Sequence, residues 1–453
     1  MASQEMRLER DSMGELEVPA NAYYGANSRR AELNFPISKL RFGRSFVKAI
    51  AQIKQSAAVV NLELGALDEE IASAIIVSAQ RVIDGEFDEE FIVDIFQTGS
   101  GTSTNMNANE VISNVAIEAL GGELGSRTPV HPNDHVNKGQ SSNDVIPTSI
   151  HLAAAGAIQD NLLPALKELE DSLRAKSEEF WGVVKTGRTH LQDATPIRLG
   201  QEFLGYTGQL ELAGARARTA LAELSVLALG GTAVGTGIGM HPEFSSRVIV
   251  RLRELTGLDL SETTNHFQAQ STLDAVVAAS GQLKSIAVGL LKIANDLRWL
   301  GSGPRAGIGE ITLPEVQPGS SIMPGKVNPV IAESVAMVSA QVIGNDTTIA
   351  IAGQSGNFEL NVMMPVAAHN LLESIDLLST SAVNFAHQCV NGLEATGKGP
   401  EMVMQGLAIG TVLAPIIGYD AAAGIAHEAS VSGENIREVA LRMTDLTEEQ
   451  LDE

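Results

Sequence analysis

The sequence predicts a mainly α-helical protein built around a bundle of long helices. Aromatic residues are scarce, with 12 Phe, 4 Tyr and 2 Trp, while 44% of the 453 residues are hydrophobic. The core must therefore be built from Ala, Leu, Ile and Val, which favours close-packed helices over a β-sandwich. A helix of about 30 residues spans about 45 Å, too long for an ordinary compact domain. The segments with apolar residues at helical spacing are 145–181, 196–229, 273–300, 329–352 and 365–392.

Three parts follow one another along the chain. Residues 1–140 form a mixed, mostly helical N-terminal domain, with an irregular lead over 17–36 and helices near 46–64 and 69–83. Residues 141–397 form the central domain of long helices. Beyond Gly397 the sequence turns acidic and less regular, so 398–453 is predicted to be a small C-terminal helical domain.

The charge of the chain limits the partners that it can bind, and its cysteine content indicates the cellular compartment. With 31 Lys and Arg against 55 Asp and Glu, the net charge of −24 argues against nucleic acid or an acidic membrane as partner. No secretory signal is visible, and the apolar stretch 275–291 is interrupted by Gln282, Lys284 and Ser285, so we expect no membrane span. Cys389 is the single cysteine, which fits a soluble protein of a reducing cytoplasm.

The segment Gly-Ser-Ser-Ile-Met-Pro-Gly-Lys-Val-Asn-Pro at 319–329 carries the strongest chemical signal. Two hydroxyls, a glycine-flanked backbone, a cation and an amide suit a carboxylate, with Lys326 neutralising its charge. The alternative is a linker in which Asn328 caps the next helix and Pro329 is its first residue. That alternative explains neither the lysine nor the serine pair.

Three other polar segments could also carry chemistry. In Gly-Arg-Thr-His-Leu-Gln-Asp at 187–193, His190 is either a proton carrier or an interhelix hydrogen-bonding residue. Glu333 either serves the start of its helix or orients and charges a histidine. The runs 98–105 and 140–144 precede helices, whose N-termini bind anions, although as plain capping sequences they need no function.

Other ligand motifs are excluded by their spacing. The glycines of 319–326 are too far apart for a phosphate loop, and Val327 replaces the magnesium-binding hydroxyl residue. Gly235, Gly237 and Gly239 lack the strand and helix context of a dinucleotide site. His-Pro-Asn-Asp-His at 131–135 has metal-like spacing, but its proline and Asn-Asp pair indicate a turn, so no metal site is expected.

Taken together, these motifs resemble the class II fumarases, within the superfamily that also holds aspartase, argininosuccinate lyase and adenylosuccinate lyase. The similarity extends over nearly the whole chain, and the segment 319–329 looks like the superfamily's signature. Aspartase is the close rival, since some aspartases share 187–193. Phe-Gln-Thr-Gly-Ser-Gly-Thr at 96–102 and Gln-Ser-Ser-Asn-Asp at 140–144 favour fumarase. A non-catalytic structural protein is a further alternative, because the superfamily also contributed lens crystallins.

The resemblance implies reversible anti hydration of fumarate to L-malate, a step of the tricarboxylic acid cycle, through a carbanion (aci-carboxylate) intermediate. In this family's pattern Ser320 is the base, and His190 paired with Glu333 handles the leaving hydroxyl; some accounts make His190 the base. Lys326 and Asn328 would bind the carboxylate that gains charge. The positions that match the family's substrate-binding residues are Ser100, Gly101, Thr102, Ser141, Ser142, Asn143, Thr189, Ser321, Lys326, Val327 and Asn328.

The resemblance also implies a homotetramer, with active sites shared between subunits and the long helices merged into one bundle. No metal or organic cofactor is implied. A second dicarboxylate site would lie at His131, Pro132, Asn133 and Asp134. Its flank departs from the family's pattern, because the arginine stands one place earlier, at Arg127.

Overall fold

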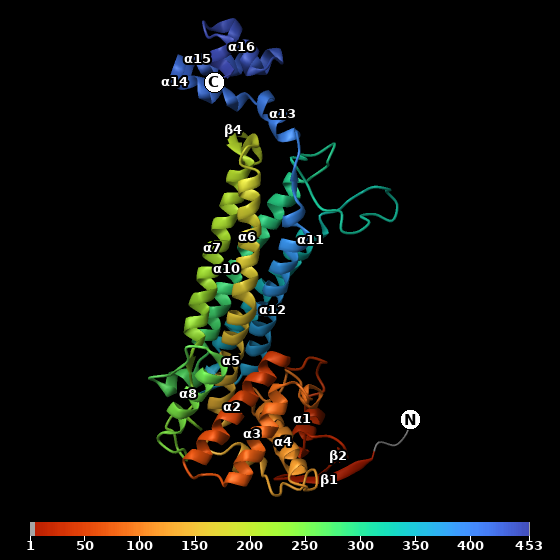
Figure 1. The fold of residues 1–453 in the computed structure, drawn as a ribbon, viewed down its shortest axis with the longest axis vertical. Helices are drawn as coiled ribbons and strands as arrows, with labels where there is room; N and C mark the ends of the chain where they lie inside the picture. The colour runs from red at the N-terminus through yellow and green to blue at the C-terminus, as the bar shows by residue number, and fades with distance from the viewer. Residues whose placement is uncertain (1–4, 453) are drawn as a thin grey trace. The chain divides into compact units, whose positions relative to one another are not determined.

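The computed structural model describes residues 5–452, most of them in helices (Figure 1). Within this part of the chain the strands form two-stranded sheets only, so there is no layered sheet core. The predicted mainly α-helical class is confirmed.

The predicted long helices are present with nearly the expected bounds. The segment 145–181 is a continuous helical run in which a π-helical turn separates two α-helices. The others are single helices, the longest of 27 residues, about 40 Å at 1.5 Å per residue. The elements are α5 Ser142–Ala157, η3 Ile158–Leu162, α6 Leu163–Glu179, α7 Leu199–Leu224, α10 Asp274–Leu300, α11 Val330–Gly353 and α12 Met364–Gln388.

The chain forms two compact units, each assembled from three stretches of sequence. The first contains residues up to 164, 215–287 and 340–379, and the second contains 165–214, 288–339 and the residues from 380 on. The division falls inside α6, α7, α10, α11 and α12, so each unit contains part of these five helices. The three-domain division of the sequence stays a prediction.

The first unit contains a group of helices from the N-terminal part of the chain. Helix α2 packs against α3, α5 and α8, and buries Phe46, Ile50 and Ile53 completely. Its elements outside the long helices are β1 Met6–Asp11, β2 Gly14–Pro19, α1 Ala26–Asn34, α2 Arg44–Glu63, α3 Glu69–Ile83, η1 Asp88–Glu90, α4 Thr102–Ala119, η2 Pro132–Val136, β5 Val226–Leu227, α8 Phe244–Thr256, β6 Ser261–Glu262, α9 His266–Ser271, β8 Gly356–Asn357 and β9 Leu360–Asn361.

The lead over 17–36 is more regular than predicted. It contains the end of the β1–β2 hairpin, paired from Met6↔Pro19 to Asp11↔Gly14, and then α1. The buried carboxylate of Glu110 on α4 accepts hydrogen bonds from the backbone N–H groups of Gly25, Asn27 and Ser28 at 2.9–3.0 Å. The start of α1 is thus stabilised by a residue more than 80 positions away, which local sequence cannot reveal.

The second unit contains a β-hairpin and a C-terminal group of short helices. These helices enclose a small core of their own, with Ile425, Val439 and Ala440 buried. The elements are β3 Val184–Thr189, β4 Gln192–Arg198, β7 Ile311–Thr312, η4 Val390–Gly392, β10 Glu394–Ala395, α13 Lys398–Gln405, η5 Leu407–Leu413, α14 Ala414–Ile417, α15 Tyr419–Ser432, α16 Ile436–Met443 and α17 Glu448–Asp452.

Helices α10 and α11 are more apolar than the sequence analysis allowed. By length and composition alone, both could cross a membrane, with 18-residue windows of mean hydropathy 1.4 and 1.2. The short helical pair 398–405 and 407–417, bent by 69°, passes the same test as a broken span. Only 44% and 39% of the α10 and α11 windows are buried in the single chain. Val288, Met337 and Ile351 are among the large apolar side chains left exposed. Such surface marks an interaction face or a membrane contact.

Candidate active site

In the first unit, the loop before α4 is held by two glycines. A Cβ on Gly99 would lie 1.7 Å from the carbonyl oxygen of Val362, so no larger residue fits there. Gly101 has φ +71°, in the left-handed region that favours glycine. This backbone places the hydroxyls of Ser100 and Thr102 2.8 Å apart at the start of the helix.

The run 140–144 forms the predicted N-terminal cap of α5. The Ser141 hydroxyl accepts the N–H of Asn143 at 3.2 Å, and Asp144 accepts the N–H of Ser141 at 3.0 Å, which completes a capping box. The Asn143 amide donates to the Ala233 carbonyl oxygen at 2.8 Å. Capping is therefore confirmed, and it does not use the Ser142 hydroxyl, which lies beside the positive end of the helix.

The structure brings these two polar runs together. Asn105, in the first turn of α4, donates to the Ser142 hydroxyl at 3.2 Å. A Cβ on Gly101 would meet the side chain of Ile146 at 2.9 Å, so the loop before α4 lies directly on α5. Two helix N-termini with their hydroxyls thus meet in one unit, an arrangement suited to binding an anion.

A buried lysine beneath this surface was missed by the sequence analysis. Lys54 on α2 has no solvent exposure, and its ammonium donates to Asn137 Oδ1 at 2.8 Å and to Gln140 Oε1 at 2.9 Å. Burial lowers the pKa of Lys54 to about 7, and the charge of Asp144 offsets part of that shift. The sequence did hold one indication of this burial: Lys54 lies on the face of α2 that otherwise carries Ile50, Ile53 and Ala57.

Asp144 is also fully buried, and it joins the cap of α5 to the loop that contains Gly230 and Thr232. Besides the N–H of Ser141, it accepts the backbone N–H groups of Gly230 and Thr232, each at 3.0 Å. Burial raises the pKa of the Asp144 carboxyl, although these three hydrogen bonds oppose the shift.

The segment at His131–Asp134 forms a π-helical turn. His131 Nδ1 accepts the N–H groups of Asn133 and Asp134 at 3.2 and 3.1 Å, and His135 Nδ1 accepts the N–H of His131 at 2.9 Å. Since Nδ1 accepts in both rings, Nε2 is the ring nitrogen left to donate to a ligand. Within residues 5–452 no group of three or more His, Cys, Asp or Glu is placed to hold a metal ion. Arg127 lies nearby in sequence with φ +59° and an unpaired, buried Nη2.

In the second unit, His190 lies at the turn of a β-hairpin that was expected to be a loop. Thr189 pairs with Gln192, and the two residues between them, His190 and Leu191, have φ +56° and +59°. Asn and Gly normally fill such turns, and each other residue held there costs about 1–3 kcal/mol. The two strands lie so close together at Gly187 that a larger residue would not fit. A Cβ added there would lie 2.6 Å from the Thr195 carbonyl oxygen. A strained turn thus presents an exposed imidazole.

Four charged side chains hold the first strand of this hairpin in place. Lys185, 1% exposed, contacts Glu310 at 3.0 Å and Glu202 at 2.7 Å. Arg188 binds the same Glu310 through two nitrogens, at 2.9 and 3.1 Å. Burial raises the pKa of Glu202, and its contact with Lys185 lowers it in part. These charges balance within the cluster, as buried charges require.

The signature loop 319–329 is closed on itself. The Asn328 amide donates to the Gly319 carbonyl oxygen at 2.5 Å, and a Cβ on Gly319 would lie 2.0 Å from the Lys326 carbonyl oxygen. The Ser320 hydroxyl accepts the N–H groups of Ile322 and Met323 at 3.1 and 3.0 Å. Two backbone donors on one hydroxyl oxygen would stabilise negative charge on that oxygen.

The alternative of a simple helix cap is wrong for this loop. Helix α11 begins at Val330, and the Asn328 side chain bonds back to Gly319 rather than to the helix. Lys326 and Ser321 are exposed, and Glu333 lies in the first turn of α11 as expected. In the described residues no hydrogen bond or ion pair joins His190 and Glu333.

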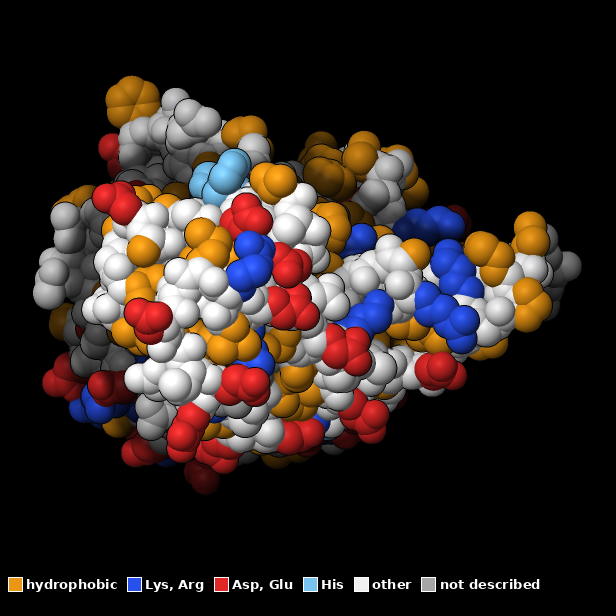
Figure 2. All heavy atoms as spheres, turned by 90° about the horizontal axis from the view of Figure 1, so that it is seen from above, with side chains coloured by type: hydrophobic (Ala, Val, Ile, Leu, Met, Phe, Trp, Pro, Cys, Tyr) orange, Lys and Arg blue, Asp and Glu red, His pale blue; other side chains and the backbone are white. Residues whose placement is uncertain are grey.

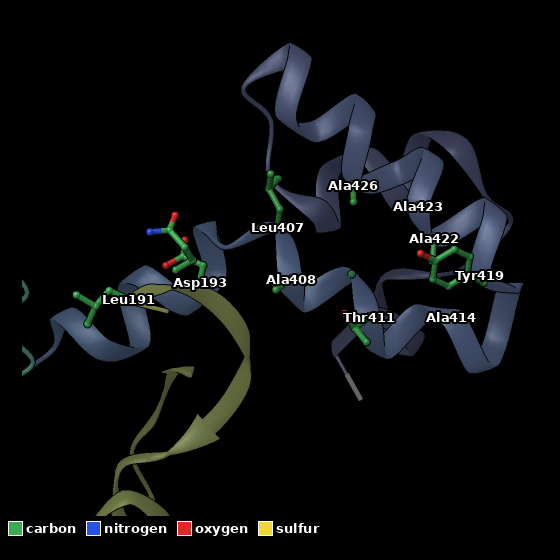
Figure 3. Close-up of a pocket in the computed structure, with 12 residues that line it drawn as sticks. Leu191, Asp193, Leu407, Ala408, Thr411, Ala414, Tyr419, Ala422, Ala423 and Ala426 are labelled. Carbon is green, nitrogen blue, oxygen red and sulfur yellow. The ribbon is translucent and has the colours of Figure 1, made fainter. Parts of the chain in front are cut away.

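A cavity of about 670 Å³ lies beside the hairpin turn in the second unit (Figure 3). Leu191 and Asp193 line one side, and Leu407, Tyr419 and several alanines of the C-terminal helices line the other. Asp193 is the charged side chain among the residues that line the cavity. Because its charge is negative, this cavity is not suited to bind a dianion. Acidic side chains are also spread over the face seen in Figure 2, which agrees with the net charge of −24.

The fold and these loops define the chain as a member of a lyase family: the family described as "Lyase" matches residues 14–344, and "Fumarase C C-terminus" matches 409–453. The chain is 51% identical over 451 residues to a class II fumarate hydratase of Methylorubrum extorquens, covering 99% of this chain and 96% of that relative. It is 50% identical over 455 residues to a mitochondrial fumarate hydratase of Rhizopus oryzae, covering 100% of this chain and 92% of the relative. A class II fumarase structure from Schistosoma mansoni superimposes with a TM-score of 0.96 at 40% identity, covering 99% and 97% of the two chains. The chain belongs to the class II fumarate hydratase family.

Proposed function

We propose that this enzyme, a carbon–oxygen lyase, adds water reversibly to fumarate and yields L-malate. The observation that carries the proposal is the identity of about half of all residues, over the whole chain, with relatives named fumarate hydratase. The signature loop 319–329 is complete within that match. Aspartate ammonia-lyase chemistry is the alternative that the test below separates.

The chemical difficulty is a weakly acidic C–H next to a carboxylate. In the dehydration direction a base removes this proton, the carboxylate takes up a second negative charge, and the hydroxyl then leaves as water. Stabilising that charged intermediate therefore matters more than the strength of the base. We assign the base to Ser320, whose oxygen accepts two backbone N–H groups that would support it as an alkoxide.

The other site residues divide by role. Lys326 and Asn328 would bind the carboxylate that gains charge, since the cation and the amide lie on the same closed loop as Ser320. The hydroxyls and amides at the two joined helix N-termini, together with Thr189, Ser321 and Val327, would hold the rest of the dicarboxylate. His190 would protonate the leaving hydroxyl, with Glu333 orienting its ring.

A homotetramer with shared active sites would complete this constellation. The His190–Glu333 pairing is not made within the described residues of one chain, so a second copy could supply it. In helices α10 and α11 more than half of each apolar window is not fully buried in the single chain, which suits a bundle shared between chains. A fully active monomer, seen by size exclusion and activity over a dilution series, would contradict this assembly.

Two further assignments belong to the same proposal. His131, Pro132, Asn133 and Asp134 would form a second dicarboxylate site, in which the Nε2–H of His131 could donate to a carboxylate. We place the enzyme in the cytoplasm on the strength of its single cysteine, although several relatives are named mitochondrial.

A single absorbance assay tests the function. The ultraviolet signal of the fumarate double bond should grow after L-malate is added and should stay flat after L-aspartate is added. Growth with aspartate alone would identify an ammonia-lyase. No signal with either would favour a structural protein.

A further inference from the structure

The strongest unassigned feature of the molecule is the buried ammonium of Lys54. It lies on α2, which packs against α3, α4, α5, α8 and η2. A charged group without solvent exposure is costly unless it is hydrogen-bonded and compensated. Lys54 has two hydrogen-bond acceptors, Asn137 Oδ1 and Gln140 Oε1, and both are neutral amides.

These contacts lead directly to the predicted substrate-binding residues. Asn137 Oδ1 also accepts the amide of Asn105 at 3.1 Å, and that same amide donates to the Ser142 hydroxyl at 3.2 Å. The Asn137 amide in turn donates to the Gln140 carbonyl oxygen at 3.1 Å. Lys54 thus holds Asn137 and Gln140 directly, and Asn105 through Asn137. The position of the turn before Ser141 and the orientation of Ser142 depend on these three side chains.

The positive charge of Lys54 has little direct compensation. Asp144 on α5 is the charged group that acts on it from the packed elements. The Asp144 carboxylate is occupied by the N–H groups of Ser141, Gly230 and Thr232, and no carboxylate in residues 5–452 lies within 4.0 Å of the Lys54 ammonium. A dianion bound above Ser142 would supply the missing negative charge.

We propose that Lys54 is a positioning residue for fumarate hydration: its ammonium holds the Asn137–Gln140 turn and the Ser142 hydroxyl in the geometry that receives a substrate carboxylate. This inference rests on the proposed function. It also implies that a bound dicarboxylate favours the charged form of Lys54, so that binding takes up protons near neutral pH. The pKa of about 7 places this titration in an accessible range.

Steady-state kinetics of Lys54→Met form the first test. We expect kcat/KM for L-malate to fall about 10- to 100-fold, mostly through a higher KM, because a charge-assisted network at the binding surface is lost. Lys176→Met is the matched control, since Lys176 is also buried but bonds to Glu179 and the Leu393 carbonyl oxygen in the second unit. It should leave KM unchanged.

Proton uptake separates positioning from a general loss of structure. Titration calorimetry with succinate, a saturated dicarboxylate, in buffers of different ionisation enthalpy at pH 7.5 measures the protons taken up. Wild type should take up a measurable fraction of a proton more than Lys54→Met does. If Lys54→Met does not fold, Lys54→Gln, which keeps a donor but no charge, should show the same reduced uptake and weaker binding.

The outcomes distinguish this inference from the function on which it rests. A wild-type protein that does not interconvert malate and fumarate overturns the proposed function. An active wild type whose folded Lys54 variants keep wild-type KM, succinate affinity and proton uptake overturns the role of Lys54 alone.

Discussion

Arg188 and Glu310 form a two-bond ion pair, with Nη2 2.9 Å from Oε1 and Nη1 3.1 Å from Oε2. Glu310 is 1% exposed, and Arg188 directly precedes Thr189 and His190 on the hairpin. The imidazole itself lies at an exposed, strained turn, and this pair, with the Lys185 contacts to Glu310 and Glu202, ties its strand to the rest of the second unit. The position of His190 thus depends on charges that never need to touch substrate.

Replacing Arg188 with glutamine should therefore affect both stability and turnover. Removing one partner of a buried ion pair costs about 3–5 kcal/mol of unfolding free energy. A displacement of His190 by about 1 Å should lower kcat/KM about 100-fold. Denaturant unfolding and initial rates measure the two effects. Arg198→Gln is the control, because Arg198 ends the same hairpin but is exposed, and its side chain donates to the Trp181 carbonyl oxygen at 2.9 Å rather than to a carboxylate. Equal kinetics of the two variants would refute the positioning argument.

Ser320→Ala should abolish most turnover while leaving the fold intact. Loss of a general base costs about 10²- to 10⁴-fold in rate. The Ser320 hydroxyl accepts two N–H groups of its own turn, so removing it should disturb only this loop. Ser321→Ala, one residue on, should instead change KM more than kcat. Near wild-type kcat in the Ser320 variant, at unchanged melting temperature and size, would remove Ser320 as the base.

Shared active sites predict complementation between two inactive variants. Suppose that a site takes His190 from one chain and Ser320 from another. Then about one quarter of the sites in randomly mixed tetramers of His190→Asn and Ser320→Ala chains should be wild type. Subunits are mixed by unfolding and refolding the two variants together, and malate turnover is measured against each variant refolded alone. No recovery would mean that one chain supplies both residues.

Lys54 predicts a specific pH dependence of stability. Its pKa is about 7 in the folded protein against an ordinary value of 10.5, so between these values the unfolded chain binds more protons. The free energy of unfolding should then rise with pH in this window, by about 1 kcal/mol per pH unit from this group. Other groups, such as the buried thiol of Cys389, cancel in the difference between wild type and Lys54→Met. Urea unfolding at pH 7, 8 and 9 should show that difference growing in favour of wild type; a constant difference would refute the shift.

The long helices could be predicted from sequence because their signal is local. Apolar residues recur at helical spacing over 273–300, and α10 occupies Asp274–Leu300. The helix α1 and the hairpin around His190 could not be predicted in this way. The first depends on Glu110 from α4, and the second on Glu310, each distant in the chain from the element that it fixes.

The candidate site shows the same limit. Ser320, Lys326 and Asn328 are recognisable together because one short loop carries them all. The role of Lys54 could not be predicted in this way. A lysine in a helix is usually exposed to solvent, and its partners Asn137 and Gln140 are far away in the sequence. Residues that act through others escape detection more readily than those that meet the ligand.

The uncovered apolar faces of α10 and α11 have a consequence for how the protein is made. A newly synthesised chain carries two segments that resemble membrane spans before any partner covers them. If other copies bury these faces, as the proposed tetramer requires, assembly and aggregation compete for the same surface, and both accelerate with concentration. The proposed tetramer thus predicts that the yield of folded enzyme depends on prompt encounter between new chains or on chaperones that shield these helices until then.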